Sequence, residues 1–402
     1  MEVAVIGGGA AGFFAAISAK KHHPEAQITI YEKSDKLLAK VKISGGGRCN
    51  VTHACFTNSQ LIKFYPRGGK QLKKAFAQFN TTDTVNWFEG RGVRLKTEAD
   101  GRMFPVSDSS QTIINCLLQE IDALKIEIQL HQPVVAIEKE NDKFKLTLRD
   151  KMIEADKVVI ANGGSPKPEG FDWLKKLGHT IESPVPSLFT FNMPNEPIKS
   201  LMGVSVDNVM VRMPGAKLKT EGPLLITHWG MSGPAILKFS AWGARILQSV
   251  NYRFTIQLNW LGTINEDKAR EILMEETRLH AKKKISNSNP FQIPHRLLIF
   301  LLSKIGINPE LTLEEAGKKN QNRLLNTLLN DEYKVEGKTT FKEEFVTCGG
   351  VCLDDISMDT MESKKCPGLY FAGEVLDIDG VTGGFNFQAA WTTGFIAGKL
   401  LQ

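Results

Sequence analysis

"VAVIGGGAAG", Val3 to Gly12, is the stretch that decides the fold. "VAVIG" is typical of a fully buried strand, "GGGAAG" of a tight turn, and the "FFAAISAKKHH" that follows of a helix. A second strand, "QITIYE" (Gln27 to Glu32), comes next. Strand, glycine turn, helix and strand within about 30 residues make one βαβ unit. The sequence therefore predicts an α/β fold that begins at the amino end.

Three glycines of this stretch, Gly7, Gly9 and Gly12, have the G-x-G-x-x-G spacing of a dinucleotide-binding turn. The first permits a tight turn, the second lets the backbone approach a pyrophosphate, and the third lets helix pack on strand. Glu32 stands 20 residues after Gly12, where a carboxylate accepts hydrogen bonds from ribose hydroxyls and repels a 2′-phosphate. We therefore expect FAD or NAD rather than NADP. The alternative is a glycine turn with only a packing role.

Two further glycine-rich segments favour FAD. "KISGGGRCNVT", Lys42 to Thr52, follows the second strand too soon to be another phosphate loop, and we interpret it as a loop beside the flavin. Near the carboxyl end, a strand (Leu369 to Ala372), a turn (Gly373 and Glu374) and a helix beginning near Gly384 form a late strand-turn-helix. The amino end of that helix would direct its partial positive charge at the N1/O2 edge of a flavin.

The composition is that of a globular protein with two or three domains. The chain has 402 residues, 42% of them hydrophobic and 23% charged, with a net charge of +6. Its longest apolar run of helical type, "LLIFLL", is far shorter than a membrane span, and Glu2 stands where a signal peptide would carry bases, so we expect no membrane and a cytoplasmic location. Six scattered cysteines without a zinc spacing predict reduced thiols and no metal. Short lysine pairs indicate a solvated face or an anionic partner.

The order of the patterns predicts a discontinuous first domain. Strand signals and glycines occur at both ends of the chain, strand patterns fill residues 184–261, and three helical patterns follow. We predict an FAD-binding domain of residues 1–185 and 340–402, a β-rich domain of 186–261 with about 330–340, and a helical domain of 262–329.

Five segments together resemble one family: "KISGGGRCNVT", "ANGGSP", "THWGMSGPAIL", "TCGGV" and "MESKKCPGLYFAGEVLDIDGVTGGFNFQAAW". It is the bacterial FAD flavoprotein family of bile-acid 4,6-dien-3-one reductase-like and aminoacetone-oxidase-like proteins, which also includes ribosomal RNA dihydrouridine synthase-like members. The resemblance covers essentially the whole chain. It implies a glutathione-reductase-like Rossmann domain that binds FAD, with an inserted β-barrel-like domain and a small helical domain. One departure is Cys348, which stands where alanine or serine is usual.

The fingerprint, the late helix and the resemblance together assign the cofactor contacts. They are Gly7, Gly9, Ala11, Gly12, Glu32, Lys33, Ser44, Gly45, Gly46, Gly47, Arg48, Cys49, Asn50, Val134, Gly163, Gly373, Glu374, Asp379, Gly384, Phe385, Asn386 and Phe387.

A flavin reductase needs a proton donor opposite the hydride, and three residues are candidates for the catalytic site. Cys49 lies in the flavin-side segment, and His228 precedes a predicted helix of the inserted domain. Their alternatives are a packed thiol and a satisfied hydrogen-bonding histidine. Arg48 could neutralise a pyrophosphate, hold a substrate carbonyl or form a structural ion pair. Arg102 and Phe104, in the predicted loop "DGRMFPVSD", could line the cavity or be an ordinary turn and a core aromatic.

The function we expect is an FAD-dependent oxidoreductase that reduces a conjugated carbon–carbon double bond. The family's substrates leave two possibilities, a small-molecule enone or a uridine in ribosomal RNA. The alternatives are a flavin-dependent amine (amino ketone) oxidase and a non-catalytic redox sensor. No second G-x-G-x-x-G is present for a nicotinamide cofactor, so NAD(P)H would either visit the flavin transiently as reductant or be replaced by another donor. The oligomeric state stays open.

Overall fold

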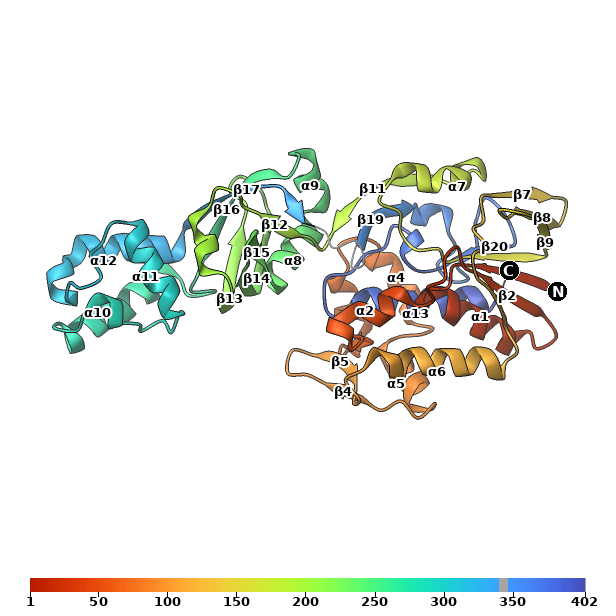
Figure 1. The fold of residues 1–402 in the computed structure, drawn as a ribbon, viewed down its shortest axis with the longest axis horizontal. Helices are drawn as coiled ribbons and strands as arrows, with labels where there is room; N and C mark the ends of the chain where they lie inside the picture. Colours follow the sequence, from red (N-terminus) through yellow and green to blue (C-terminus); the bar gives the residue numbers. More distant parts are fainter. Residues whose placement is uncertain (340–345, 402) are drawn as a thin grey trace. The chain divides into compact units, whose positions relative to one another are not determined.

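The computed structural model describes residues 1–339 and 346–401, which fold into two compact units (Figure 1). The first consists of Met1–Ser187 and Phe341–Gln402, and the second of Leu188–Thr340. The prediction of three separate domains with their boundaries stays a prediction.

The centre of the first unit is a parallel sheet with the order β20-β10-β1-β2-β6. Val5 of β1 pairs with Val159 of β10 on one side and with Ile30 of β2 on the other. All three are completely buried, as the run of β-branched residues in these strands requires. The helix α13 runs beside α1 (Figure 1), and the last strand of the sheet, β20, also comes from the carboxyl-terminal segment.

The elements of the first unit have the following bounds: β1 Glu2–Ile6, α1 Ala10–His22, β2 Gln27–Tyr31, α2 Ala39–Gly47, β3 Thr52–His53, α3 Asn58–Leu61, η1 Ile62–Phe64, α4 Gly69–Phe76, α5 Thr81–Glu89, β4 Leu95–Thr97, β5 Arg102–Pro105, α6 Ser110–Ala123, β6 Glu127–Gln129, β7 Ala136–Glu140, β8 Lys143–Thr147, β9 Met152–Ala155, β10 Lys157–Ile160, α7 Asp172–Lys176, β11 Ile181–Ser187, β19 Val346–Val351, β20 Leu369–Phe371, η6 Gly373–Val375 and α13 Phe385–Gly398.

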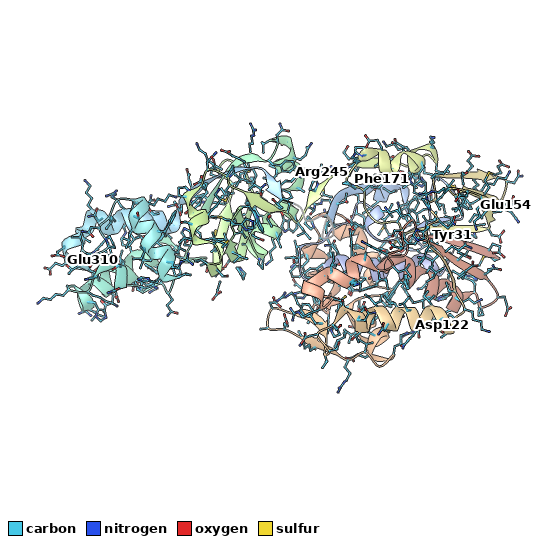
Figure 2. All side chains as sticks on the ribbon, viewed as in Figure 1. Tyr31, Asp122, Glu154, Phe171, Arg245 and Glu310 are labelled. Atoms are coloured by element: carbon cyan, nitrogen blue, oxygen red, sulfur yellow. The ribbon has the colours of Figure 1, made fainter. Side chains whose placement is uncertain are left out.

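The labelled aromatic side chains of this unit are buried and the labelled acidic ones are exposed, as Figure 2 shows. Tyr31 and Phe171 lie inside among other side chains, whereas Asp122 and Glu154 lie on the outside. Three smaller sheets complete the unit: β3-β5-β4, β7-β8-β9 and β11-β19. The segment "DGRMFPVSD" is not the loop that the sequence predicts, because Arg102–Pro105 pairs with both β3 and β4 as strand β5. Turns or bends remain only at its two ends, at Asp100–Gly101 and at Val106–Asp108.

The second unit has a seven-stranded sheet with the order β17-β16-β13-β14-β15-β12-β18. Its elements are β12 Thr190–Asn192, β13 Ser205–Arg212, β14 Lys219–Ile226, β15 Gly230–Ser232, α8 Pro234–Trp242, α9 Ala244–Ser249, β16 Arg253–Asn259, α10 Glu266–His280, α11 His295–Lys304, α12 Leu313–Leu329, β17 Asp331–Glu336 and β18 Lys338–Thr339. The predicted helices of residues 262–329 are present as α10, α11 and α12.

One hydrophobic core joins the sheet and the helices of the second unit. The buried carboxylate of Asp331 sits within it and accepts hydrogen bonds from Trp260 Nε1 at 2.9 Å and Tyr333 Oη at 2.5 Å. Lys304 of α11 reaches the same carboxylate at 2.5 Å. Side chains of α11, of β17 and of the residue after β16 therefore bind one buried carboxylate, which links the helical part to the sheet.

Among the described residues no helix is long and apolar enough to cross a membrane. All six cysteines are free.

Candidate functional site

The turn between β1 and α1 has the three glycine roles that the fingerprint requires. Gly7 has a φ of +112°, and a Cβ there would collide with the carbonyl oxygen of Ala161. A Cβ on Gly12 would collide with the carbonyl oxygen of Gly7. At Gly9, by contrast, a Cβ would meet no described atom within 4 Å. Gly7 and Gly12 are thus required by the fold, whereas Gly9 leaves open space for a ligand against the backbone.

The first turn of α1 offers its amides to that space. Gly9 is the N-cap, and among the described residues no side chain caps the turn. The first turn also contains no acidic residue that would compete for the helix N-terminus. Unsatisfied N–H groups and the helix dipole make such an end a site for a phosphate anion.

Glu32 is held at the end of β2 over the glycine turn. Its carboxylate accepts hydrogen bonds from Gly8 N at 2.9 Å, from Ser34 N at 2.9 Å and from Ser34 Oγ at 2.8 Å. The side chain is therefore fixed beside the glycine turn, half-buried, while Lys33 is exposed, and the contact of Glu32 with a ribose stays a prediction.

The segment of Val134 passes the same place. Gln132 N donates to the carbonyl oxygen of Glu32 at 2.9 Å. The side-chain Oε1 of Gln132 is buried and has no hydrogen-bond partner among the described residues. A buried acceptor without a donor is costly, and an adenine or ribose donor would satisfy it. The partly buried Val134 stays a predicted adenine contact.

The GGGRCN segment meets the amino end of α13 through Asn50. With its amide oriented to satisfy both neighbours, Asn50 Nδ2 donates to the carbonyl oxygen of Thr52 at 2.9 Å, and its Oδ1 accepts from Gly384 N at 3.0 Å. Gly384 caps the helix with a φ of +91°, and a Cβ there would lie 2.6 Å from the Thr52 oxygen. Two glycine motifs more than 300 residues apart in sequence therefore form one surface.

Helices α1 and α13 run in the same direction with their backbones in contact. A Cβ on Gly394 would lie 2.5 Å from the Ala11 carbonyl oxygen, and a Cβ on Gly398 would collide with that of Ala15. Ten residues separate Gly384 from Gly394, but only two separate the α1 N-cap Gly9 from Ala11, so at 1.5 Å per residue the amino end of α13 extends about 12 Å beyond that of α1. The unit thus presents two helix N-termini, pointing the same way and offset, to one extended anionic ligand.

The predicted flavin-side loop is the irregular end of α2. Ser44 leaves helical geometry with a ψ of 149°, and Gly45, Gly46 and Gly47 have φ values of +58°, +70° and +84°. A Cβ on Gly46 or Gly47 would meet no described atom within 4 Å, but one on Gly45 would lie 2.7 Å from Phe104 Cε1. Gly46 and Gly47 therefore leave their surroundings open, whereas Gly45 is needed for close packing.

The two candidate catalytic residues of this segment differ in access. Cys49 is completely buried, and burial raises the pKa of its thiol to about 12. These properties favour its packing role, because a buried thiol of high pKa is inert. Arg48 lies over the Phe104 ring at 4.0 Å and pairs with Glu98 at 2.6 Å. The pair is partly exposed rather than the buried ion pair that was the alternative, and the role of Arg48 at the cofactor or substrate stays a prediction.

Four other predicted contacts are engaged within the protein. The Asp379 carboxylate is buried and is bound by Arg67, with Nε to Oδ1 at 2.5 Å, and by Ser187 Oγ at 2.8 Å. Glu374 pairs with Lys40 at 2.5 Å. The Asn386 amide bonds both backbone groups of Gly380, which closes the loop before α13, and Phe387 stacks on Trp391 at 5.6 Å. Any contact of Asp379 with FAD would therefore come from its backbone.

The remaining predicted positions fall in two places. Gly373 approaches α1 so closely that a Cβ would lie 2.8 Å from that of Ala11, and Gly163, after β10, has a φ of +76° with no described atom in the way of a Cβ. His228 belongs to the second unit, exposed in the turn between β14 and β15 and edge-on to Trp229 at 4.4 Å. Its role as a proton donor stays a prediction.

Two residues at the site escaped the sequence reading. His53 stacks on Phe385, the first residue of α13, with ring centroids 4.7 Å apart, and Phe385 stacks on Phe64 at 4.3 Å. Arg67 holds Asp379, as described above. His53 could have been found from its position directly after "GGGRCNVT", and Arg67 from the two glycines that follow it in "RGG".

These residues fit FAD. The open glycines, the two uncapped helix ends and the buried Gln132 oxygen match a long dinucleotide with a pyrophosphate and a ring system.

Comparison with known proteins agrees with the fold. The family described as "HI0933-like protein Rossmann domain" matches residues 1–400. A ribosomal RNA dihydrouridine synthase of Escherichia coli (strain K12) is 30% identical over 402 residues, covering 98% of this chain and 96% of the relative. A 3-dehydro-bile acid delta(4,6)-reductase of Clostridium scindens is 27% identical over 409 residues, covering 99% and 98%. The solved structure of a 3-ketosteroid delta1-dehydrogenase from Sterolibacterium denitrificans has a TM-score of 0.51 at 12% identity and covers 98% of both chains. The predicted α/β Rossmann fold with a sheet-rich insertion is confirmed.

Proposed function

Because the chain belongs to the HI0933-like protein family, we propose that it is an FAD-dependent oxidoreductase that adds a hydride to a carbon–carbon double bond conjugated to a carbonyl. The two relatives described above support this reaction class, since their names denote reduction of a uracil ring and of an unsaturated 3-oxo steroid. Both substrates contain such a double bond. Hydride adds at the β carbon and a proton at the α carbon.

The observation that carries the proposal is the pair of parallel helix N-termini within the first unit. The uncapped first turn of α1 receives the pyrophosphate, with Gly9 as the place of close approach. The amino end of α13, held by Asn50, would stabilise negative charge on a bound flavin. Glu32 and Val134 serve the ribose and the adenine at the other end. When bound, FAD supplies the hydride.

The proton has to come from a group that water and substrate can reach. The buried Cys49 is poorly suited, and Arg48 is engaged with Glu98. The half-buried imidazole of His53 stands beside the amino end of α13, on Phe385, and is the first-unit residue best placed for this role. His228 is the candidate from the second unit. The reductant is NAD(P)H, which we place as a transient visitor.

The experiment is a pair of half-reactions on the purified yellow protein. Anaerobic NADH or NADPH should bleach the flavin absorbance, and a conjugated dienone or uridine-containing RNA should restore it. Mass spectrometry of ribosomal RNA from a deletion strain should then reveal a lost two-dalton increment on uridine if RNA is the substrate. Peroxide release with an amino ketone, and none of these reductions, would establish the amine oxidase instead. A flavin that no nicotinamide reduces would refute the enzyme in favour of a redox sensor.

His53→Phe tests the proton donor, because phenylalanine retains the ring stack without a titratable group. We expect normal flavin bleaching and slow reoxidation by substrate. A variant with unchanged reoxidation would exclude His53, and the matching change at His228 would then be decisive. The cytoplasm, where ribosomes and reduced nicotinamides occur, is the proposed location.

A further inference from the structure

One segment of the first unit is basic without any acid. Residues 36–82 contain no aspartate or glutamate, although they contain nine lysines and arginines: Lys36, Lys40, Lys42, Arg48, Lys63, Arg67, Lys70, Lys73 and Lys74. The segment runs from α2 through β3, α3 and η1 to the end of α4. It therefore includes the GGGRCN segment and His53.

The helix α4 concentrates this charge on one face. Leu72, Ala75 and Phe76 are buried, whereas Lys70, Lys73 and Lys74 are exposed. No carboxylate of the described residues lies within 4.0 Å of Lys70 or Lys73, and the pair of Lys74 with Asp359 is long, at 3.5 Å, between two side chains about two-thirds exposed. Such a pair contributes little.

Two other lysine runs of the chain are partly neutralised by neighbouring carboxylates. Lys283 pairs with Glu276 at 3.3 Å, and Lys284 with Glu310 at 2.5 Å. On α7, Lys175 pairs with Asp172 at 2.8 Å. The α4 face thus differs from an ordinary solvated surface, in which both signs alternate.

The basic face begins at the loop that precedes α13. Gly68, the N-cap of α4, lies so close to this loop that a Cβ would be 2.6 Å from Ile378 Cγ1. Phe64 lies two residues before Pro66. Its carbonyl oxygen accepts a hydrogen bond from Val381 N at 2.9 Å, and its ring stacks on Phe385. Lys70 follows Gly68 by two residues, and Lys73 follows by a little more than one helical turn. The lysines are therefore close to the proposed site.

We propose that the exposed face of α4, formed by Lys70, Lys73 and Lys74, binds the phosphate backbone of RNA and delivers a uridine to the site. This inference rests on the proposed function and selects RNA over a free enone as the substrate class. Lys70 and Lys73, without a paired carboxylate among the described residues, and Lys74, in its long exposed pair, gain affinity from phosphates through counterion release, whereas an apolar enone would gain nothing from them. The rings of His53 and Phe64, which are partly exposed and stack on the buried Phe385, are the kind of element on which an unpaired base can lie.

The test is fluorescence anisotropy of a labelled RNA hairpin with a uridine-containing loop, titrated with the FAD-loaded protein at several salt concentrations. We expect K70Q/K73Q to weaken binding about tenfold or more at 0.1 M salt, and to reduce the slope of log K against log salt by roughly 1.4 to 1.8. The matched control is K175Q/K176Q, which also removes two lysines from a first-unit helix and should leave RNA binding unchanged. An unchanged flavin absorbance spectrum and circular dichroism confirm that each variant is folded.

Each outcome has one meaning. Equal loss in the two double variants, or none in K70Q/K73Q, would overturn the α4 surface while leaving the reductase proposal intact. Wild-type protein that reduces a dienone but binds no RNA would overturn RNA as the substrate class alone. Binding of an acidic peptide in place of RNA would refute the RNA surface in favour of a protein partner. Failure of the flavin half-reactions would refute the proposed function itself, whatever the anisotropy gives.

Discussion

Removing Arg67 should destabilise the first unit by an amount that depends on pH. The side chain bonds both oxygens of Asp379, and the Asp379 carboxylate has no exposed surface. Ser187 supplies one more hydrogen bond at 2.8 Å. Arg67→Met therefore leaves a buried carboxylate with a single neutral donor. Breaking a buried pair from one side costs about 3–5 kcal/mol.

The cost of Arg67→Met depends on pH because the Asp379 carboxyl can be protonated. Burial already raises the pKa of Asp379, and Arg67 opposes that effect. Without Arg67 the pKa of Asp379 in the folded state rises further. A carboxyl whose folded pKa is above its unfolded value stabilises the fold below the unfolded pKa, and this stability is lost as the pH rises through the folded value. Arg67→Met should thus be less destabilising near pH 5 than near pH 8.

The free energy of unfolding of the first unit is measured in urea at the two pH values, with the rise in flavin fluorescence on release of FAD as the signal. Asp379→Asn removes the negative charge and leaves the mostly buried Arg67 guanidinium without its counterion, so it should also cost about 3–5 kcal/mol. The double variant R67M/D379N should be less damaging than the sum of the two single changes by about 0.5–3 kcal/mol. The buried ion pair would be refuted if the free-energy costs of the two single variants were additive and the cost of Arg67→Met were the same at both pH values.

Three further predictions follow from the site. Gly9→Ala should leave the apo fold intact but weaken FAD binding, because its Cβ enters the space left for the ligand. Gly12→Ala should lower the unfolding temperature of the apoprotein itself, because its Cβ collides with Gly7. Reversed results in calorimetry and FAD titration would disprove this division of roles. Asn50→Leu should cost about 1–3 kcal/mol in a chemical denaturation curve, because Gly384 N and the Thr52 carbonyl lose their partner, and a neutral substitution would contradict the bridge. Cys49 should resist iodoacetamide in the folded protein at pH 8, since its thiol has a pKa of about 12, and mass spectrometry that finds Cys49 alkylated before the partly exposed Cys55 would contradict its burial.

Local patterns made most of the Rossmann part predictable. The run "VAVIG" and the spacing of Gly7, Gly9 and Gly12 specify strand, turn and helix because each requirement acts within a few residues. The late helix was predicted from Gly384 for the same reason, and α13 begins one residue later. Family resemblance supplied Val134, which no local pattern marks.

Pairings between distant segments were not predictable in this way. No period or spacing connects Arg67 with Asp379, since the pair forms only when η1 and the loop before α13 are packed together. The β5 strand was missed because "GRMFP" contains glycine and proline at its ends and finds its partners in β3 and β4. The accessibility of Cys49 likewise depends on tertiary burial, so its chemistry could not be judged from its motif.

The contact between α1 and α13 also bears on how the protein is made. The glycine turn of α1 is synthesised long before its neighbour α13, which ends at Gly398. The 153 residues of Leu188–Thr340 are a compact unit that can fold while the first unit is still incomplete. Until the last helix arrives, α1 exposes the strip around Ala11 and Ala15 that α13 covers. The surface of α1 and α13 on which FAD would lie is therefore complete only after α13 has been synthesised.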